Sequence, residues 1–351
     1  MSNKAKQVIS PWRGLFGIPL VATVTFMALM LATAALNGLP VRDPDGFLGP
    51  SYVRLPLIVL LVMVADVVPR VVAQRPTVRT LLRTVVRVVR SRWTMPRVAA
   101  IAAGMASFYF AYVAYRNLKS FLPFLRDRLT DSMLVDTDRW LAGGGNPSDV
   151  LHDLLGTGFT AEFLSVVYVS FLIFVPVSLA VSMVWSDDLS RGAWYVSALC
   201  FNWILGTAAY YLLPSLGPIY VEESSFTDLP MTATSDLQES LYENRLEVLV
   251  DPNATQSVQG IAAFASLHVS IVFTAALMAH LVRLPRPFRW LLWAYVGFTG
   301  LATVYFGWHY ILDVPAGLAI GALSVWLAAI ATGIIRFPGR RRETEKLQPM
   351  A

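Results

Sequence analysis

Eight apolar segments recur along the chain, and each is separated from the next by polar or charged residues. Each segment is close to the ~20 residues that a helix needs to cross the hydrocarbon core of a bilayer. The pattern therefore predicts an all-α fold, a polytopic membrane helical bundle with about eight transmembrane helices. The segments cover residues 14–36, 52–69, 98–115, 160–185, 192–213, 260–282, 290–308 and 310–335.

The composition supports a membrane protein and limits the kinds of metal or disulfide site that the chain can form. The 351 residues are 56% hydrophobic and 15% charged, whereas soluble domains carry about 25% charged residues. A single cysteine, Cys200, excludes a disulfide framework and a cysteine-based metal site. No carboxylate cluster in the sequence demands a metal ion, so we expect neither a metal nor a cofactor.

The distribution of basic residues predicts the orientation in the membrane. With the N-terminus inside, 20 of the 28 Lys and Arg residues fall on cytoplasmic segments, in agreement with the positive-inside rule. We therefore expect a multi-pass protein of the plasma membrane with both termini in the cytoplasm. The net charge of +5 is then a topology signal, and no nucleic-acid partner is expected.

Two N-terminal features allow more than one interpretation. The first apolar segment resembles a signal peptide, but it is longer than the ~7–15 apolar residues of a signal sequence, which favours a retained helix. Residues 70–97 are rich in arginine, and Arg75, Arg79, Arg83 and Arg87 recur every four residues. This spacing is typical of a basic amphipathic helix on the anionic inner leaflet, although a solvated loop fits almost as well.

Two long connections are predicted on the outer side of the membrane. Residues 116–159 carry both signs of charge, and residues 214–259 are strongly acidic. Long loops are often functional lids, but they are equally often plain connectors.

Ionisable residues at the mouths of the helices suggest a functional site, because they are costly inside a membrane. His268 lies near the outer end of the sixth segment, and His309 and Asp313 lie at the outer junction of the last two. A helix would place His309 and Asp313 one above the other, so that the carboxylate fixes the imidazole tautomer. An interfacial histidine beside a helix-start aspartate is the structural alternative. His152 and His280 are interpreted as surface residues.

Two short motifs carry a family resemblance. Ser266-Leu267-His268 and His309-Tyr310-Ile311-Leu312-Asp313 resemble the second and third motifs of the type 2 phosphatidic acid phosphatase superfamily, most closely those of its inositol phosphorylceramide synthase-like branch. The resemblance covers a six-helix core. It places the catalytic core in 98–335 and leaves the first two predicted helices unexplained. The rest of the chain is then two N-terminal transmembrane helices with the Arg-rich segment in 1–97 and a basic cytoplasmic tail in 336–351.

The resemblance implies a lipid phosphatase or phosphotransferase that needs no metal. His309 would attack phosphorus to form a phosphohistidine, Asp313 would orient it, and His268 would protonate the leaving oxygen. His268 would then activate water or an alcohol acceptor such as inositol. The implied substrate is a phospholipid or prenyl phosphate, bound at the extracytoplasmic face. The oligomeric state stays open.

The sequence departs from the family pattern at its phosphate-binding cations. Tyr210 and Gly217 occupy the Lys and Arg positions of the first motif, and Ala302-Thr303 occupies the Ser-Arg of the third. A transferring phosphoryl group still needs positive partners. We therefore expect Arg116 and Lys119 to bind the phosphate, although cations that snorkel to the interface would look the same.

The sequence also offers further residues that could bind the phosphate, and it allows a second class of function. Ser266 and Ser215 are expected to donate hydrogen bonds to the phosphate, and Arg54 and Arg245 are more remote cations on the same side. The alternative is a proton-coupled lipid or solute transporter that uses the histidines and the aspartate as a relay. That function predicts ionisable residues near the bilayer midplane.

Overall fold

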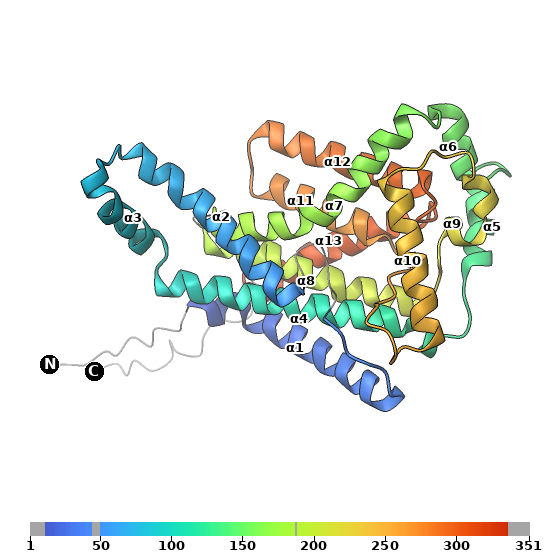
Figure 1. Ribbon diagram of the computed structural model, residues 1–351, viewed down its shortest axis with the longest axis horizontal. Coiled ribbons are helices and arrows are strands. Elements are labelled where there is room, and N and C mark those ends of the chain that lie inside the picture. Colours follow the sequence, from blue (N-terminus) through green and yellow to red (C-terminus); the bar gives the residue numbers. More distant parts are fainter. Residues whose placement is uncertain (1–10, 44–49, 187, 336–351) are drawn as a thin grey trace, which may run out of the picture.

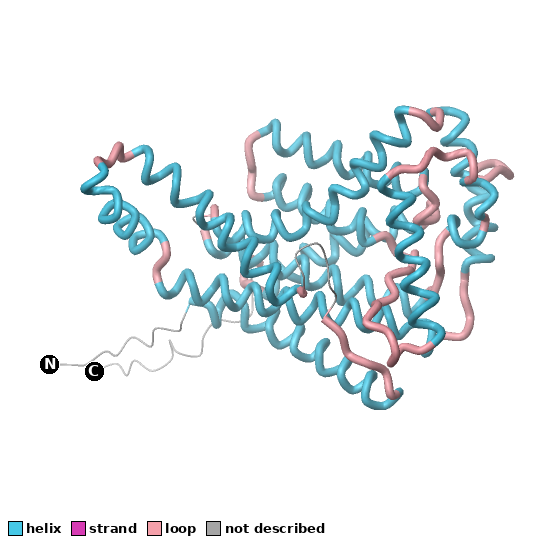
Figure 2. Tube along the Cα trace, in the orientation of Figure 1, coloured by secondary structure: helices cyan, strands magenta, loops and turns pink. Residues whose placement is uncertain are grey.

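The apolar segments of the chain fold into helices, and the computed structural model describes residues 11–43, 50–186 and 188–335. No strand occurs in these ranges (Figure 2), so the prediction of an all-α polytopic bundle is confirmed. The helices are α1 (Pro11–Asn37), α2 (Ser51–Ala73), α3 (Val78–Arg92), α4 (Met95–Leu125), α5 (Asp131–Leu141), α6 (Pro147–Leu155), α7 (Phe159–Val184), α8 (Leu189–Leu212), α9 (Pro218–Val221), the 3-10 helix η1 (Glu223–Phe226), α10 (Ala233–Val250), α11 (Leu267–Leu281), α12 (Arg286–Tyr305) and α13 (Asp313–Ala331).

Five of the described helices, α1, α2, α4, α7 and α13, are long and apolar enough to cross a membrane. This is the pattern of an integral membrane protein. The other three predicted segments correspond to α8, α11 and α12. Helix α11 has only 15 residues, because residues 260–266 at its predicted start are not helical. The predicted tail at 336–351 lies outside the described residues.

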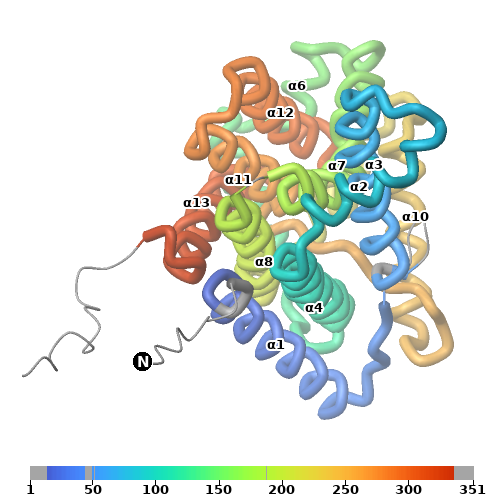
Figure 3. The backbone as a smooth tube through the Cα atoms, turned by 90° about the vertical axis from the view of Figure 1, so that its left-hand side faces the viewer, coloured from blue at the N-terminus to red at the C-terminus, as the bar shows by residue number. Residues whose placement is uncertain are grey.

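Helix α8 occupies the middle of the bundle (Figure 3), where it contacts α1, α4, α7, α11 and α13. Helix α1 belongs to the same core: Phe16 and Met30 are buried in one apolar cluster with Phe108 of α4 and Leu199 of α8. The core therefore includes a helix N-terminal to residue 98. The six-helix division at residue 98 stays a prediction.

Close contact between α11 and α13 depends on Gly317. A Cβ atom at this position would overlap the backbone carbonyl oxygen of Ser266, directly before α11. Glycine therefore allows the first turns of the two helices to pack side by side. Their N-terminal ends, which carry His268 and Asp313, are adjacent for this reason.

The two long outer connections are largely helical, which corrects their interpretation as loops. Asn146 accepts a hydrogen bond from the Ser148 N–H (2.9 Å) and Pro147 follows it, so α6 begins with favourable capping residues. Thr232 and Ser235 form a reciprocal capping box at the start of α10. Helices α5, α6, α9 and α10 gather at one end of the bundle, and the α2–α3 hairpin lies at the other (Figure 1).

Candidate active site

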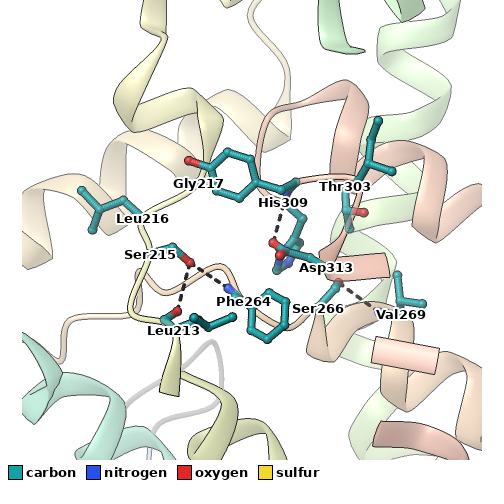
Figure 4. Close-up of polar contacts among 12 residues, drawn as sticks. Leu213, Ser215, Leu216, Gly217, Phe264, Ser266, Val269, Thr303, His309 and Asp313 are labelled. Carbon is teal, nitrogen blue, oxygen red and sulfur yellow. Dashed lines mark hydrogen bonds and ion pairs between the residues drawn. The ribbon is translucent and has the colours of Figure 1, made fainter. Parts of the chain in front are cut away.

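The two histidines and the aspartate expected to form a site lie together at one end of the bundle. His268 is the second residue of α11, His309 lies in the connection after α12, and Asp313 is the first residue of α13. His309 Nδ1 is 3.1 Å from Asp313 Oδ2 (Figure 4). The ring centroids of His268 and His309 are 6.0 Å apart. The three side chains, which were expected at the same face of the membrane, therefore lie close together although they come from separate elements.

His309 and Asp313 do not share a helix, so the geometry behind their predicted contact is wrong. Helix α12 ends at Tyr305, Gly307 turns the chain with a φ of +66°, and the His309 N–H donates to the Thr303 carbonyl at 3.1 Å. The Asp313 carboxylate also accepts the Tyr310 N–H at 3.1 Å. A turn fastened at both ends thus holds the imidazole against the carboxylate.

Aromatic rings fix the position of His268. Its ring stacks on Tyr168 with a centroid distance of 4.5 Å and lies 4.2 Å from the ring of Phe171. Trp308 stacks on Tyr168 at 5.1 Å. Because Trp308 is the neighbour of His309 in the sequence, this aromatic stack joins the two histidine-bearing segments through α7.

Both serines expected at the phosphate hold the backbone of the site (Figure 4). The Ser266 hydroxyl accepts a hydrogen bond from the Val269 N–H at 3.4 Å and caps α11. The Ser215 hydroxyl accepts from the Phe264 N–H at 3.0 Å and lies 3.4 Å from the Leu213 carbonyl. These bonds join the segment before α9 to the segment before α11. The role of the two hydroxyls toward phosphate stays a prediction.

Lys119 and Arg116 lie within a helix, not beyond its end, because α4 continues to Leu125. Lys119 is buried, and its Nζ lies 4.7 Å from the ring centroid of Tyr210 and 5.8 Å from that of Tyr115. Its charge is near enough to interact with His268. Lys119 therefore lies inside the bundle against Tyr210 of α8 instead of snorkelling to the surface.

Arg116 of α4 and helix α10, which carries Arg245, approach each other at Gly260. A Cβ on Gly260 would meet Nη1 of Arg116 at 3.3 Å and a methyl group of Leu241 at 2.9 Å, so these side chains converge at this glycine. Arg245 lies one helical turn after Leu241 and interacts electrostatically with Asp131. Burial lowers the pKa of Arg245. Arg245 is therefore closer to the candidate site than its position in the sequence indicates.

Helix α5 supplies two buried carboxylates that the sequence analysis missed. Asp131 accepts hydrogen bonds from the N–H groups of Leu216 (2.9 Å) and Gly217 (3.1 Å) and from the Tyr310 hydroxyl (2.7 Å). Asp138 accepts the Ile311 N–H at 3.0 Å. The two aspartates are seven residues apart, which is about two helical turns, and this spacing is the signal that could have found them.

Through these hydrogen bonds, α5 holds two loops of the candidate site in place. Asp131 joins the segment of Ser215 to the turn that carries His309, and Asp138 fastens the other side of that turn. Desolvation by burial raises the pKa of Asp138 to about 7, against the opposing effect of the Ile311 N–H. Burial and the Asp131 carboxylate also raise the pKa of Tyr310, which keeps its hydroxyl a hydrogen-bond donor.

The other two histidines lie apart from the pair. His280 is exposed, as predicted. His152 is partly buried, which differs from its interpretation as a surface residue: its Nε2 is 2.8 Å from the Tyr305 carbonyl, and its ring packs against the Tyr305 ring at 4.6 Å. It fastens α6 to the end of α12. In the described part of the chain, no group of three or more His, Cys, Asp or Glu side chains is arranged to hold a metal ion.

Comparison with known families agrees with this geometry. The model of the PAP2 superfamily matches residues 132–327, more than half of the chain and all of the segment from His268 to Asp313. The protein therefore belongs to the PAP2 superfamily, whose members are phosphatases that act on phosphate esters. Searches of curated proteins and of solved structures give no match.

Proposed function

We propose that the protein is an integral membrane phosphotransferase or phosphatase that acts on a lipid-linked phosphate through a phosphohistidine intermediate. The observation that carries the proposal is the 3.1 Å contact between His309 Nδ1 and Asp313 Oδ2, with the His268 ring centroid 6.0 Å from that of His309. A fixed imidazole beside a second imidazole provides a nucleophile and an acid for the same phosphate.

The first step transfers the phosphoryl group to His309. Because a carboxylate only accepts hydrogen bonds, Nδ1 carries the ring proton and Nε2 carries the lone pair. Nε2 attacks phosphorus while the bond from phosphorus to the leaving oxygen breaks. His268, in its imidazolium form, gives its proton to that oxygen and becomes neutral.

The second step regenerates the enzyme. Neutral His268 takes a proton from water or from an alcohol, whose oxygen attacks the phosphohistidine as the N–P bond breaks. Water gives inorganic phosphate, and an alcohol gives a new phosphoester. We favour transfer to an alcohol such as inositol, as in the inositol phosphorylceramide synthase-like branch, because the chain shares the Ser266-Leu267-His268 motif and lacks the usual motif cations.

The charge on the transferring group requires cations, and Lys119 and Arg116 are proposed to supply them. Lys119 is buried at Tyr210, the position at which the family pattern has a lysine. An ammonium group from a neighbouring helix thus reaches the place that the motif residue would serve. In a site screened from water, such a positive group stabilises a phosphoryl transition state strongly.

A lipid-linked phosphate suits the position of the site. The site lies at one end of apolar helices, so a substrate whose chains remain in the bilayer can present its phosphate there. The excess of basic residues on the opposite side supports an extracytoplasmic site in the plasma membrane. Phospholipids and prenyl phosphates both fit this description.

The decisive experiment is to trap phosphate on the protein. The full-length protein in lipid nanodiscs is incubated with phosphatidic acid, a prenyl diphosphate or a phosphoinositide, each with and without inositol, and the protein is digested under alkaline conditions. We expect a phosphoryl mass increase on the peptide that contains His309. His309→Ala should abolish it, and His280→Ala, a change at an exposed histidine, should leave it unchanged.

Two results would contradict the proposal. Turnover that survives in His309→Ala would exclude the phosphohistidine. Proton-driven uptake of a solute, with no phosphate released from any substrate, would favour the transporter. The ionisable trio at one end of the helices, and not at their middle, argues against that alternative.

A further inference from the structure

Helix α3 carries a surface that neither the fold nor the proposed chemistry uses. The helix lies at the end of the bundle opposite the site (Figure 1). Its buried residues are Thr84 and Val88, and Val88 packs with Val67 and Val71 of α2. Most of the remaining circumference is exposed.

The exposed part of α3 consists of two parallel strips. One strip is apolar: Val78, Leu82 and Val86 are exposed by 93%, 73% and 39%. Because residues four apart lie on one face of a helix, these side chains form a continuous line. The residue after each of them is an exposed arginine, so a second line runs beside the first and contains Arg79, Arg83 and Arg87.

Nothing nearby in the sequence balances this charge. Residues 67–126 contain no Asp or Glu, and the basic residues of 67–97 are eight arginines without a lysine. The preceding acid, Asp66, is buried and binds Arg70 and Arg92, with Arg92 Nε 3.0 Å from its carboxylate. Within the described residues, Arg79, Arg83 and Arg87 form no ion pair or hydrogen bond with another side chain.

We propose that α3 is a docking surface for anionic phospholipids at the bilayer surface on this side of the protein. Arginine forms paired hydrogen bonds with phosphate oxygens, and the strip of Val78, Leu82 and Val86 enters the boundary between headgroups and acyl chains. The apolar strip distinguishes a lipid surface from a soluble polyanion, which would leave it in water. The proposal is independent of the catalytic chemistry.

The packing of α3 makes this surface rigid. The Asp66 carboxylate binds residues on both arms of the α2–α3 hairpin, and the valine cluster closes the space between the arms. The two strips are therefore presented at a fixed angle to the bundle. A preformed surface loses little conformational entropy when lipids bind.

A depth and composition probe on α3 tests the proposal. Leu82→Cys is labelled with an environment-sensitive dye in the full-length protein, in which Cys200 is buried and protected from labelling. The protein is reconstituted in phosphatidylcholine nanodiscs that contain, at equal low mole fraction, either brominated phosphatidylglycerol or brominated phosphatidylcholine. We expect quenching by both lipids, with a preference for the anionic one of at least about fivefold, which corresponds to 1 kcal/mol from a single arginine.

A matched pair of variants assigns the preference to α3. Arg79→Gln, Arg83→Gln and Arg87→Gln together should reduce the preference to nearly one. The control variant removes the same charge near the start of α12 by substitution of Arg283, Arg286 and Arg289, and it should keep the lipid preference. The proposal is overturned if the dye is not quenched, or if both triple variants lose the lipid preference equally. It is also overturned if the protein prefers RNA to anionic nanodiscs and this preference depends on the α3 arginines.

Discussion

The side chain of Lys119 lies over the ring of Tyr210, with Nζ 4.7 Å from the ring centroid. Lys119 is on α4 and Tyr210 is on α8, and Tyr210 occupies the position of a lysine in the family pattern. The ammonium group of a neighbouring helix thus lies at the residue that occupies the motif lysine's position. Under the proposed function, Lys119 would take the part of that lysine.

Substitutions of Lys119 test whether its charge acts on the phosphate. Lys119→Met keeps most of the apolar stem and removes the charge, so we expect kcat/KM to fall by about 10²-fold to 10³-fold, as for the loss of one electrostatic contact in a transition state. Lys119→Arg should retain part of the activity. Steady-state assays in nanodiscs measure both. Unchanged kinetics in Lys119→Met would remove Lys119 from the phosphate site.

Asp313 is expected to act by orienting His309. Asp313→Asn retains the size of the side chain but presents an amide to His309 Nδ1, which disturbs the tautomer with Nε2 free to attack. We expect kcat to fall by about 10²-fold to 10⁴-fold with little change in KM. Trapped phosphohistidine should form more slowly in single-turnover experiments. Normal trapping with slow product release would contradict this role.

Helix α5 positions the His309 turn through Tyr310. Tyr310→Phe removes the hydroxyl that donates to Asp131 at 2.7 Å and leaves the backbone donors of that carboxylate in place. A hydrogen bond to a charged group contributes ~1.5–3 kcal/mol, so we expect a loss of about tenfold to 100-fold in kcat if that energy holds the turn. Tyr242→Phe, at an exposed tyrosine of α10, is the control. Equal effects of both substitutions would exclude a specific role.

Asp138 should make the stability of the protein depend on pH. Its pKa is raised from 3.8 to about 7 by burial, so the folded state keeps a proton that the unfolded state loses first. Stability must therefore fall as the pH rises through this interval and level off above it. Asp138→Asn should flatten the dependence of Tm between pH 5 and 8, whereas Asp136→Asn, at an exposed residue of the same helix, should preserve it. A parallel pH dependence in Asp138→Asn and the unaltered protein would contradict the assignment.

Gly317 sets the distance between the helices that carry His268 and Asp313. Gly317→Ala places a methyl group against the Ser266 carbonyl and should destabilise the protein by ~1–3 kcal/mol through overpacking. Gly297→Ala is the matched control, because it has open space around it in α12, where alanine favours the helix. Thermal unfolding in detergent compares the two. A stable Gly317→Ala with normal activity would show that the helices can separate without consequence.

The sequence predicted the parts of this molecule that depend on local composition. Apolar length identified the helices, and the order of two motifs identified the histidines and Asp313. The sequence did not reveal how α5 contributes, because Asp131 and Asp138 act on backbone groups about 80 to 180 residues away. The spacing of the two aspartates indicates that they share a face of α5, but it does not reveal which distant groups they bind. The contact between His309 and Asp313 was predicted through the wrong geometry, because Gly307 ends α12 before the histidine.

The hydrogen bonds of α5 have a consequence for how the protein becomes active. The carboxylates of α5 hold both loops of the site, whereas α1, α4, α8 and α11 pack together in one apolar cluster. We therefore expect assembly of the bundle and completion of the site to be separate events. Under mild denaturant, we expect catalytic activity to be lost while the helical content is still intact.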